Sequence, residues 1–193
     1  PLGYAIGNAL EVKEAIETLQ GKGPKDLTEL CLVLGSQMVV LAEKAKSLEE
    51  GRKLLEENLT NGKAFEHFKT FLVSQGGDAS VVDNPELLPK ASNLIEVKAT
   101  TSGTVKSIIA DHLGTAAMML GAGRATKESE IDLAAGIMLH KKVGDSVSKG
   151  EPLLTLHSNS KNVDAVIDLI QSSIIVTDEK TEKPTLIYDV ITE

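Results

Sequence analysis

The sequence predicts an α+β protein whose two halves follow different patterns. Residues 8 to about 75 carry apolar side chains at helical spacing, and glycines stand where the helices end. From residue 93 onward, short apolar and β-branched runs are divided by glycine turns, which is typical of strands. Because the first half has little strand content to cover its apolar faces, we expect it to be the helical remnant of an α/β domain.

Two capping patterns open the first two predicted helices. Asn8 with Glu11 three positions later has the composition of a capping box, and Gly21 is expected to end that helix. Asp26 with Glu29 repeats the pattern, and apolar residues then recur at helical spacing over about five turns.

Two further helices complete this half. The third is predicted to begin at Ser47, with a glutamate three positions later, and to end near the Asn61-Gly62 pair. The fourth ends at Gly76-Gly77. Since no partner layer is predicted beside them, we expect exposed apolar surface on the helices at 27–46 and 61–75, and as a result either association of the chain or an altered packing.

The second half is predicted to combine short strands with two helices. The helices span roughly His112 to Leu120 and Val163 to Ser173, the latter with Asn162 as its cap. The strand-like runs are Leu94 to Thr100, Gly103 to Ile109, Gly136 to Lys142, Pro152 to His157, Ile174 to Thr177 and Leu186 to Ile191.

Between the halves, residues 78–92 contain two prolines and no clear period, which is typical of a linker. The predicted domains are therefore the trailing helices of an α/β domain at 1–77, the linker at 78–92, and a C-terminal module at 93–193.

Composition excludes several function classes. The formal net charge of −8 and the pI of about 5.1 argue against a nucleic-acid partner, which requires a concentrated basic face. No apolar run approaches the roughly 18 residues of a membrane helix, and no secretory leader is recognisable. The single cysteine, Cys31, fits a reducing compartment, so we expect a cytoplasmic protein.

Few residues carry recognisable chemistry. Cys31 lies on the apolar stripe of the second helix, and we expect a buried structural thiol and not a nucleophile. The sequence has no Walker loop, nucleophile elbow, zinc-protease motif or cysteine cluster. The four histidines lack metal-ligand spacing and are expected to be ordinary core or surface residues: His67, His112, His140 and His157.

The glycine-rich stretch from Gly114 to Arg124 allows two interpretations. A Gly-x-Gly-Arg turn could present backbone N–H groups and a guanidinium to an anion. However, the third glycine of a dinucleotide fingerprint is absent and no helix opens after Gly123. We favour a helix C-cap followed by a loop, with a solvated charged run behind it.

Lys141 to His157 resembles the turn pattern of lipoyl and biotinyl carrier domains. Its V-G-D-x-V-x-K-G-x-x-L arrangement predicts tight turns at Gly144-Asp145 and Lys149-Gly150. The modifiable lysine that carriers present at a hairpin tip, in a Met-Lys-Met or Asp-Lys-Ala setting, is missing. The pattern therefore indicates a barrel-sandwich-hybrid α+β module without a swinging-arm cofactor.

Taken across its length, the chain resembles bacterial pyrimidine-nucleoside phosphorylases of the thymidine-phosphorylase group. Its first nineteen residues, PLGYAIGNALEVKEAIETL, are similar to a motif that lies within the polypeptide of those enzymes. The other stretches that carry the resemblance are ELCLVLGSQMV from Glu29, QGGDASVVDNP from Gln75, GTAAMMLGAGRATKESEIDLAAGI from Gly114, KKVGDSVSKGEPLLTL from Lys141 and PTLIYD from Pro184.

The resemblance implies an activity and an assembly. Members of the family are dimers that catalyse reversible phosphorolysis, in which inorganic phosphate attacks the anomeric carbon of uridine, thymidine or deoxyuridine. The products are the free base and a pentose 1-phosphate. Uridine and thymidine preference is not expressed in these residues, because the family's pyrimidine contacts match no position here.

The same resemblance implies only part of an active site. The family's phosphate-binding and pyrimidine-binding motifs precede the segment matching Pro1, so no catalytic or substrate-binding residue is assigned here. What carries over is half of a K⁺ site, formed by the main-chain carbonyls of Leu2 and Ala5 and the carboxylate of Glu14. Oxygen-only ligation suits a hard cation, and no organic cofactor is implied. The alternative for Glu14 is a solvated acid paired with Lys13 or with a residue one turn away.

Three functional hypotheses follow. The chain is an enzyme part that is inactive alone, a free-standing binding or carrier module related to biotinyl domains, or a scaffold that uses the module for oligomerisation. The absence of a tip lysine weighs against the second, and the uncovered helical half weighs against the third.

Overall fold

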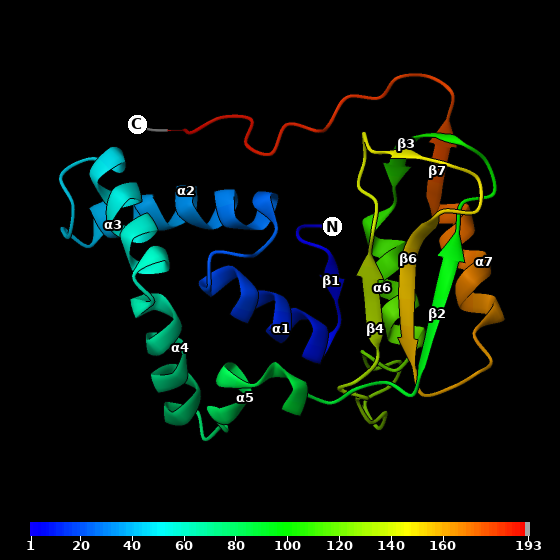
Figure 1. Ribbon diagram of the computed structural model, residues 1–193, viewed down its shortest axis with the longest axis horizontal. Helices are drawn as coiled ribbons and strands as arrows, with labels where there is room; N and C mark the ends of the chain where they lie inside the picture. Colours follow the sequence, from blue (N-terminus) through cyan, green and yellow to red (C-terminus); the bar gives the residue numbers. More distant parts are fainter. Residues whose placement is uncertain (192–193) are drawn as a thin grey trace. The chain divides into compact units, whose positions relative to one another are not determined.

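The computed structural model describes residues 1–191 and divides into two compact units (Figure 1). The strand-rich unit comprises Pro1, Gly3–Val12 and Leu88–Thr185. The helical unit comprises Lys13–Leu87, together with Leu2 and the described tail from Leu186. The first helix, α1 (Asn8–Leu19), has residues in both units. None of the helices within residues 1–191 has the length and apolar character needed to span a bilayer.

The helical unit contains the predicted helices with small differences at their ends. After α1 it holds α2 (Lys25–Leu41), α3 (Leu48–Thr60), α4 (Lys63–Ser74), α5 (Ser80–Asp83) and the short 3₁₀ helix η1 (Pro85–Leu87). The last two lie inside the predicted linker span. The predicted domain boundaries at 77 and 93 stay predictions. A division into compact units by contacts need not follow the boundaries of the family domains.

One capping prediction in the helical unit is confirmed and one is wrong. Ser47 caps α3, and its side-chain oxygen accepts from the N–H of Glu50 at 3.2 Å. Asp26 does not cap α2, which begins at Lys25 after Pro24, and its Oδ1 accepts instead from the N–H of Leu27 at 2.9 Å. A proline at the cap position sets the extended backbone that opens the helix without a side-chain bond.

An ion-pair network ties α2 to α3. Arg52 donates from Nη1 and Nη2 to the two carboxylate oxygens of Glu29 at 2.9 and 2.7 Å, and from Nε to Glu56 Oε1 at 2.7 Å. The hydrogen bond from Arg52 lowers the pKa of the Glu29 carboxyl below its ordinary value. The helices also approach closely where Gly51 faces Ser36, since a Cβ at Gly51 would lie 3.1 Å from the Ser36 carbonyl oxygen.

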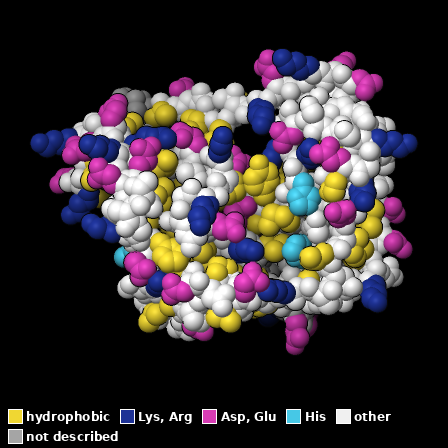
Figure 2. All heavy atoms as spheres, viewed as in Figure 1, with side chains coloured by type: hydrophobic (Ala, Val, Ile, Leu, Met, Phe, Trp, Pro, Cys, Tyr) yellow, Lys and Arg dark blue, Asp and Glu magenta, His cyan; other side chains and the backbone are white. Residues whose placement is uncertain are grey.

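The helical unit leaves much apolar surface uncovered, as expected. On α2, Met38 is 69% exposed and Leu41 is 83% exposed, and on α4 Phe71 and Val73 are exposed as well. Figure 2 shows hydrophobic side chains reaching the surface over these helices. Cys31 is also exposed, so the expectation of a buried thiol is wrong. Cys31 lies on the predicted apolar stripe but is not buried, because no residue of this unit among residues 1–191 covers that part of α2.

The strand-rich unit consists of two antiparallel sheets and two helices. Four strands form one sheet in the order β1 (Ala5–Ile6), β4 (Gly136–Leu139), β6 (Pro152–Ser158) and β2 (Asn93–Lys98). Three form the other in the order β5 (Ser146–Val147), β3 (Gly103–Ile108) and β7 (Ile174–Thr177). The helices are α6 (Ala110–Met119) and α7 (Asp164–Ser173), which contact each other.

A single apolar core fills this unit. Alternate residues of the first sheet point into it, including Val97 on β2, Ile137 on β4, and Leu154 and Leu156 on β6. The second sheet adds Val105, and both helices contribute their buried faces. The sheets and helices of this unit therefore cover each other's apolar sides, and residues 97–174 supply the buried core.

Most predicted elements of the second half are confirmed, and two details of this half and one at the start of the chain are wrong. The tail from Leu186 to Ile191 forms no strand, and Asn162 does not cap α7, whose cap residue is Val163. Asn8 is the first residue of α1 and does not cap it. The strands β1 and β5, each two residues long, were not predicted, because such short segments show no period.

The two turns of the carrier-like pattern form as predicted. Gly144 and Gly150 have φ values of +88° and +85°, which favour glycine. The Asp145 carboxylate accepts from the N–H of Lys142 at 2.9 Å and pairs with Lys183 at 3.0 Å. Burial opposes ionisation of Asp145, but the hydrogen bonds from Lys142 and Lys183 outweigh it and lower its pKa.

Candidate functional site

The three residues assigned to the cation half-site lie on successive elements at the start of the chain. Leu2 precedes β1, Ala5 lies in β1, and Glu14 lies on α1. Ala5 is grouped with the strand-rich unit, whereas Leu2 and Glu14 are grouped with the helical unit. Their ligand role stays a prediction, and the structure provides the local setting of each residue.

Ala5 lies on an edge strand. β1 stands at one edge of its sheet and pairs antiparallel with β4, with Ala5 opposite Met138. The N–H of Leu139 donates to the carbonyl of Tyr4 at 2.8 Å, so the neighbouring Tyr4–Leu139 pair is a hydrogen-bonded one. Because hydrogen-bonded and non-hydrogen-bonded pairs alternate, the carbonyl of Ala5 points away from β4 and outside the ladder.

Glu14 is an acid in a buried position. Its residue is 8% exposed, and it is the one acidic residue in the buried class within residues 1–191. Its backbone carbonyl accepts from Thr18 Oγ1 at 2.7 Å, which satisfies part of the helix locally. Charged side chains are seldom buried unless they are paired or bind an ion. Glu14 is therefore not a solvated surface acid.

These donors fit the chemistry of a hard monovalent cation. A carbonyl outside the ladder and a buried carboxylate are oxygen ligands, which hard cations prefer. Over residues 1–191, His, Cys, Asp and Glu form no group of three or more that could hold a metal ion. The predicted ligand set accordingly combines main-chain oxygens with the carboxylate of Glu14.

The glycine-rich stretch after α6 is a helix C-cap, as favoured. The N–H of Ala122 donates to Ala117 O at 3.0 Å and that of Gly121 to Met118 O at 2.9 Å, which is a Schellman motif. Gly121 has a φ of +105°, compatible with this role. The N–H groups of Gly121 and Ala122 donate to carbonyls of the last helical turn, so they are unavailable to an anion.

Two of the four histidines serve as ties between elements. His112 Nδ1 lies 2.9 Å from the hydroxyl of buried Ser173, which joins α6 to α7. His140 Nε2 lies 2.8 Å from Thr155 Oγ1. Since Ser173 is fully buried, its hydroxyl is not accessible as a nucleophile.

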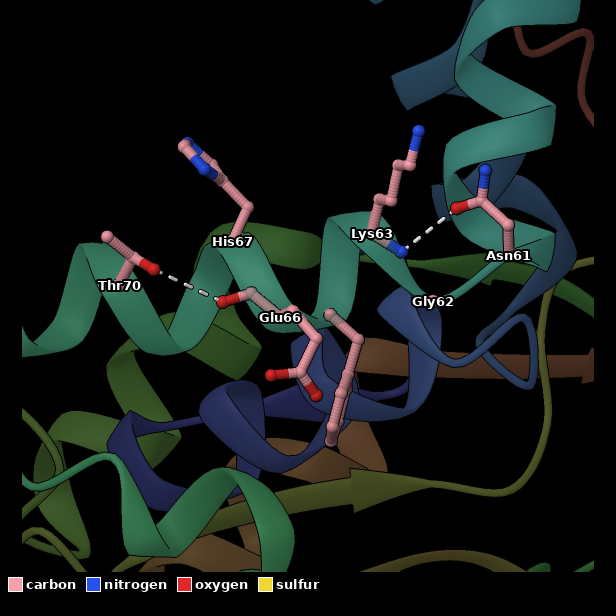
Figure 3. Close-up of a pocket in the computed structure, with 7 residues that line it drawn as sticks. Asn61, Gly62, Lys63, Glu66, His67 and Thr70 are labelled. Atoms are coloured by element: carbon pink, nitrogen blue, oxygen red, sulfur yellow. Dashed lines mark hydrogen bonds between the residues drawn. The ribbon is translucent and has the colours of Figure 1, made fainter.

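An open depression of about 490 Å³ lies along α4 in the helical unit. Figure 3 shows that its polar side chains do not converge, because Lys63 and His67 point away from Glu66. Glu66 pairs instead with Lys69 at 2.9 Å. We assign no chemistry to this depression, whose lining residues are Asn61, Gly62, Lys63, Phe65, Glu66, His67 and Thr70.

The contact that sequence patterns missed is made by Asn8. Its side-chain Nδ2 donates to the carbonyl of Ala122 at 2.9 Å, across 114 residues of sequence. Glu11 Oε1 accepts from the N–H of Gly7 at 2.8 Å, so Glu11 performs the capping role at the start of α1. No local pattern could reveal this use of Asn8, because the acceptor lies in a distant loop.

Comparison with known proteins identifies two family domains in the chain. Residues 1–65 match the Glycosyl transferase family, a/b domain, and residues 104–177 match the Pyrimidine nucleoside phosphorylase C-terminal domain. The first match begins in the segment that contains Leu2, Ala5 and Glu14.

Individual relatives agree with these matches. The chain is 64% identical over 193 residues to the pyrimidine-nucleoside phosphorylase of Staphylococcus haemolyticus. It is 61% identical over 191 residues to that of Geobacillus stearothermophilus and 62% identical over 193 residues to that of Bacillus subtilis. Each match covers 99–100% of this chain and 44% of the relative. The chain is homologous to the C-terminal portion of the pyrimidine-nucleoside phosphorylases, combining part of their a/b domain with their C-terminal domain.

Proposed function

We propose that this chain supplies the C-terminal part of a phosphorylase that uses inorganic phosphate to split uridine, thymidine or deoxyuridine. The observation that carries the proposal is the sequence identity of about 60% to the three relatives. This identity extends over both units and is not confined to one motif. The products are the free base and a pentose 1-phosphate. A homodimer in the cytoplasm, with a barrel-sandwich-hybrid C-terminal module, belongs to the same proposal.

Within this proposal, the chain contributes half of a K⁺ site and no phosphate or pyrimidine site. The carbonyls of Leu2 and Ala5 and the carboxylate of Glu14 are the proposed ligands. K⁺, when bound, supplies positive charge that joins this segment to the part of the enzyme that binds phosphate. The structural support is the direction of the Ala5 carbonyl, outside the ladder, and the burial of Glu14.

The carrier hypothesis gains no support from the lysines of the carrier-like pattern. Lys142 Nζ donates to the carbonyl of Pro1 at 2.6 Å, and Lys141 Nζ pairs with Glu151 Oε1 at 2.5 Å. Both ammonium groups are held by other parts of the strand-rich unit, whereas a swinging arm needs a freely extended lysine. Lys149 lies in the turn that the fold itself uses.

A release assay tests the proposed function. Phosphate-dependent release of uracil or thymine is measured for the 193-residue chain and for a chimera that adds the upstream part of the Bacillus subtilis relative. We expect no release by the chain and release by the chimera, because the chimera restores the phosphate-binding and pyrimidine-binding segments. Release by the short chain contradicts its proposed inactivity. A folded chimera without activity contradicts the proposed reaction.

A further inference from the structure

We propose that Asn8 is a positioning residue for the cation half-site, because its amide fixes the turn between Ala5 and Glu14 to the loop that follows α6. The inference rests on the proposed function, of which the half-site is a part. Asn8 itself is not proposed as a ligand. Its effect on the cation passes through the main chain of β1 and the first turn of α1.

The first turn of α1 is bonded to both ends of one loop. Asn8 Nδ2 donates to Ala122 O at 2.9 Å, and the N–H of Ala9 donates to Leu133 O at 3.1 Å. The loop is closed on itself, since the N–H of Asp132 donates to Gly121 O at 2.9 Å. A displacement of the turn would therefore break contacts at two points of a braced loop.

Two glycines bring the backbones of the turn and of β4 into direct contact. Gly7 has a φ of +121°, and a Cβ there would lie 2.6 Å from Ala135 O and 2.8 Å from Gly136 Cα. A Cβ on Gly136 would in turn overlap the carbonyl oxygen of Ile6. Backbone contacts of this kind cannot relax by rotation of a side chain, so they define the position of the turn closely.

Ala5 is thus held on both sides. Before it, the carbonyl of Tyr4 accepts from Leu139, and Lys142 Nζ lies over the Tyr4 ring at 5.2 Å. After it, the backbone of Gly7 lies against Gly136, and the side chain of Asn8 donates to Ala122 O. The direction of the Ala5 carbonyl is therefore fixed by the C-terminal part of the chain, and on the far side of Ala5 the side chain of Asn8 adds its bond to the Ala122 carbonyl.

The side chain of Asn8 serves this tie and not the start of the helix. An asparagine at this point in sequence is expected to cap by accepting from the N–H of Glu11, but that N–H donates to the carbonyl of Gly7 at 2.9 Å. The amide of Asn8 instead reaches a carbonyl 114 residues away. Removal of this amide should loosen the ligand segment while leaving α1 capped.

The experiment compares Asn8→Ala with Asn58→Ala. Asn58 on α3 provides the matched control, because its Nδ2 also donates to a backbone carbonyl, that of Leu54, at 2.9 Å. In the chimera described above, the K⁺ concentration for half-maximal activity is measured, and thallium NMR follows binding of Tl⁺ as a K⁺ probe. In the 193-residue chain, amide hydrogen exchange is measured at Ala5, Ile6 and Gly7.

We expect Asn8→Ala to raise the half-maximal K⁺ concentration and to weaken Tl⁺ binding by about three- to tenfold, the range of one net hydrogen bond. Activity at saturating K⁺ should recover, and exchange at Ala5 to Gly7 should accelerate by a similar factor. Asn58→Ala should change none of these quantities. A purely structural role would lower thermal stability and leave the K⁺ constant unchanged.

The possible failures are separable. If the native chimera is active but independent of K⁺ and does not bind Tl⁺, the proposed cation half-site is wrong. If it depends on K⁺ and Asn8→Ala leaves both the K⁺ constant and the exchange rates unchanged, only the positioning role of Asn8 is overturned. Equal shifts in Asn8→Ala and Asn58→Ala would also overturn it, because the effect would then not be specific to the turn.

Discussion

The two units of the chain bury their apolar residues to different extents. In the strand-rich unit, two sheets and two helices surround a common core, and residues such as Ile137, Leu154 and Leu156 are fully buried. In the helical unit, α2 carries Met38 and Leu41 with most of their surface exposed. The difference shows that helical periodicity predicts an amphipathic helix but does not supply the layer that covers it.

The largest expected contrast is between a core leucine and an exposed one. Leu156→Ala should lower the free energy of unfolding by about 2–5 kcal/mol, since it removes buried contacts and leaves a cavity. Leu41→Ala should change it by less than about 0.5 kcal/mol. Urea unfolding followed by circular dichroism measures both. Equal losses would show that α2 is covered in solution and would remove the contrast between the units.

The next contrast uses glycines inside helices. Gly51→Val should destabilise the helical unit by about 1–3 kcal/mol, because its Cβ would lie 3.1 Å from Ser36 O and the branched side chain would overpack the contact with α2. Gly114→Val on α6 is the control, since no atom lies within 4 Å of a Cβ there. Thermal unfolding measures both variants. A tolerated Gly51→Val would mean that α2 and α3 can separate without cost.

The ion pair between α2 and α3 should make part of the stability depend on pH. The pKa of Glu29 is lowered in the folded chain by its hydrogen bond with Arg52. This contribution is fully present above the unfolded carboxyl pKa and is lost as pH falls through the lower folded value. Arg52→Met should therefore lose about 1 kcal/mol or less at pH 7, and the gap to the native chain should narrow on acidification.

Chemical unfolding at a series of acidic and neutral pH values checks this dependence. Lys53→Met is the control, because the Lys53–Glu57 pair is exposed and its atoms are 4.0 Å apart. A constant gap between Arg52→Met and the native chain over that pH range would contradict the assigned role of Glu29.

Substitutions on the uncovered face of α2 should have the smallest effect on stability. Their effect on association of the chain should be clear. Replacing Met38 and Leu41 by glutamine should leave unfolding nearly unchanged, while lowering binding of an apolar dye and concentration-dependent association. Light scattering and dye fluorescence measure these properties. A native chain that is monomeric at high concentration and binds no dye would contradict the expected consequence of exposure.

Local signals in the sequence located most helices and strands. Ser47 and the glycine pairs fix helix ends through bonds within a few residues, so their chemistry is visible in the sequence. β1 was missed because two residues define no period and their partner strand lies about 130 residues away. The tail from Leu186 is rich in β-branched, aromatic and other apolar residues like a strand, yet a strand also needs an available sheet edge, which composition does not encode.

The candidate site was predictable to a smaller extent. The resemblance supplied Leu2, Ala5 and Glu14, while residue patterns alone gave Glu14 no distinction from a solvated acid. Its burial and the register of Ala5 depend on tertiary packing, as does the contact of Asn8 with Ala122. For Cys31 the error is the reverse: its apolar stripe predicts burial, but the side chain is exposed because the described residues of the unit do not cover that stripe.

The short strand β1 has a consequence for how the chain can be divided. A polypeptide beginning at residue 93 would retain the matched C-terminal domain but would lose Ala5 and Ile6, the strand that occupies the outer side of β4. β4 would then become a bare edge of apolar residues, Gly136–Leu139, able to recruit a strand from another molecule. We therefore expect Ala5 and Ile6, at the far end of the sequence, to shield the edge of β4 from pairing with a strand of another molecule.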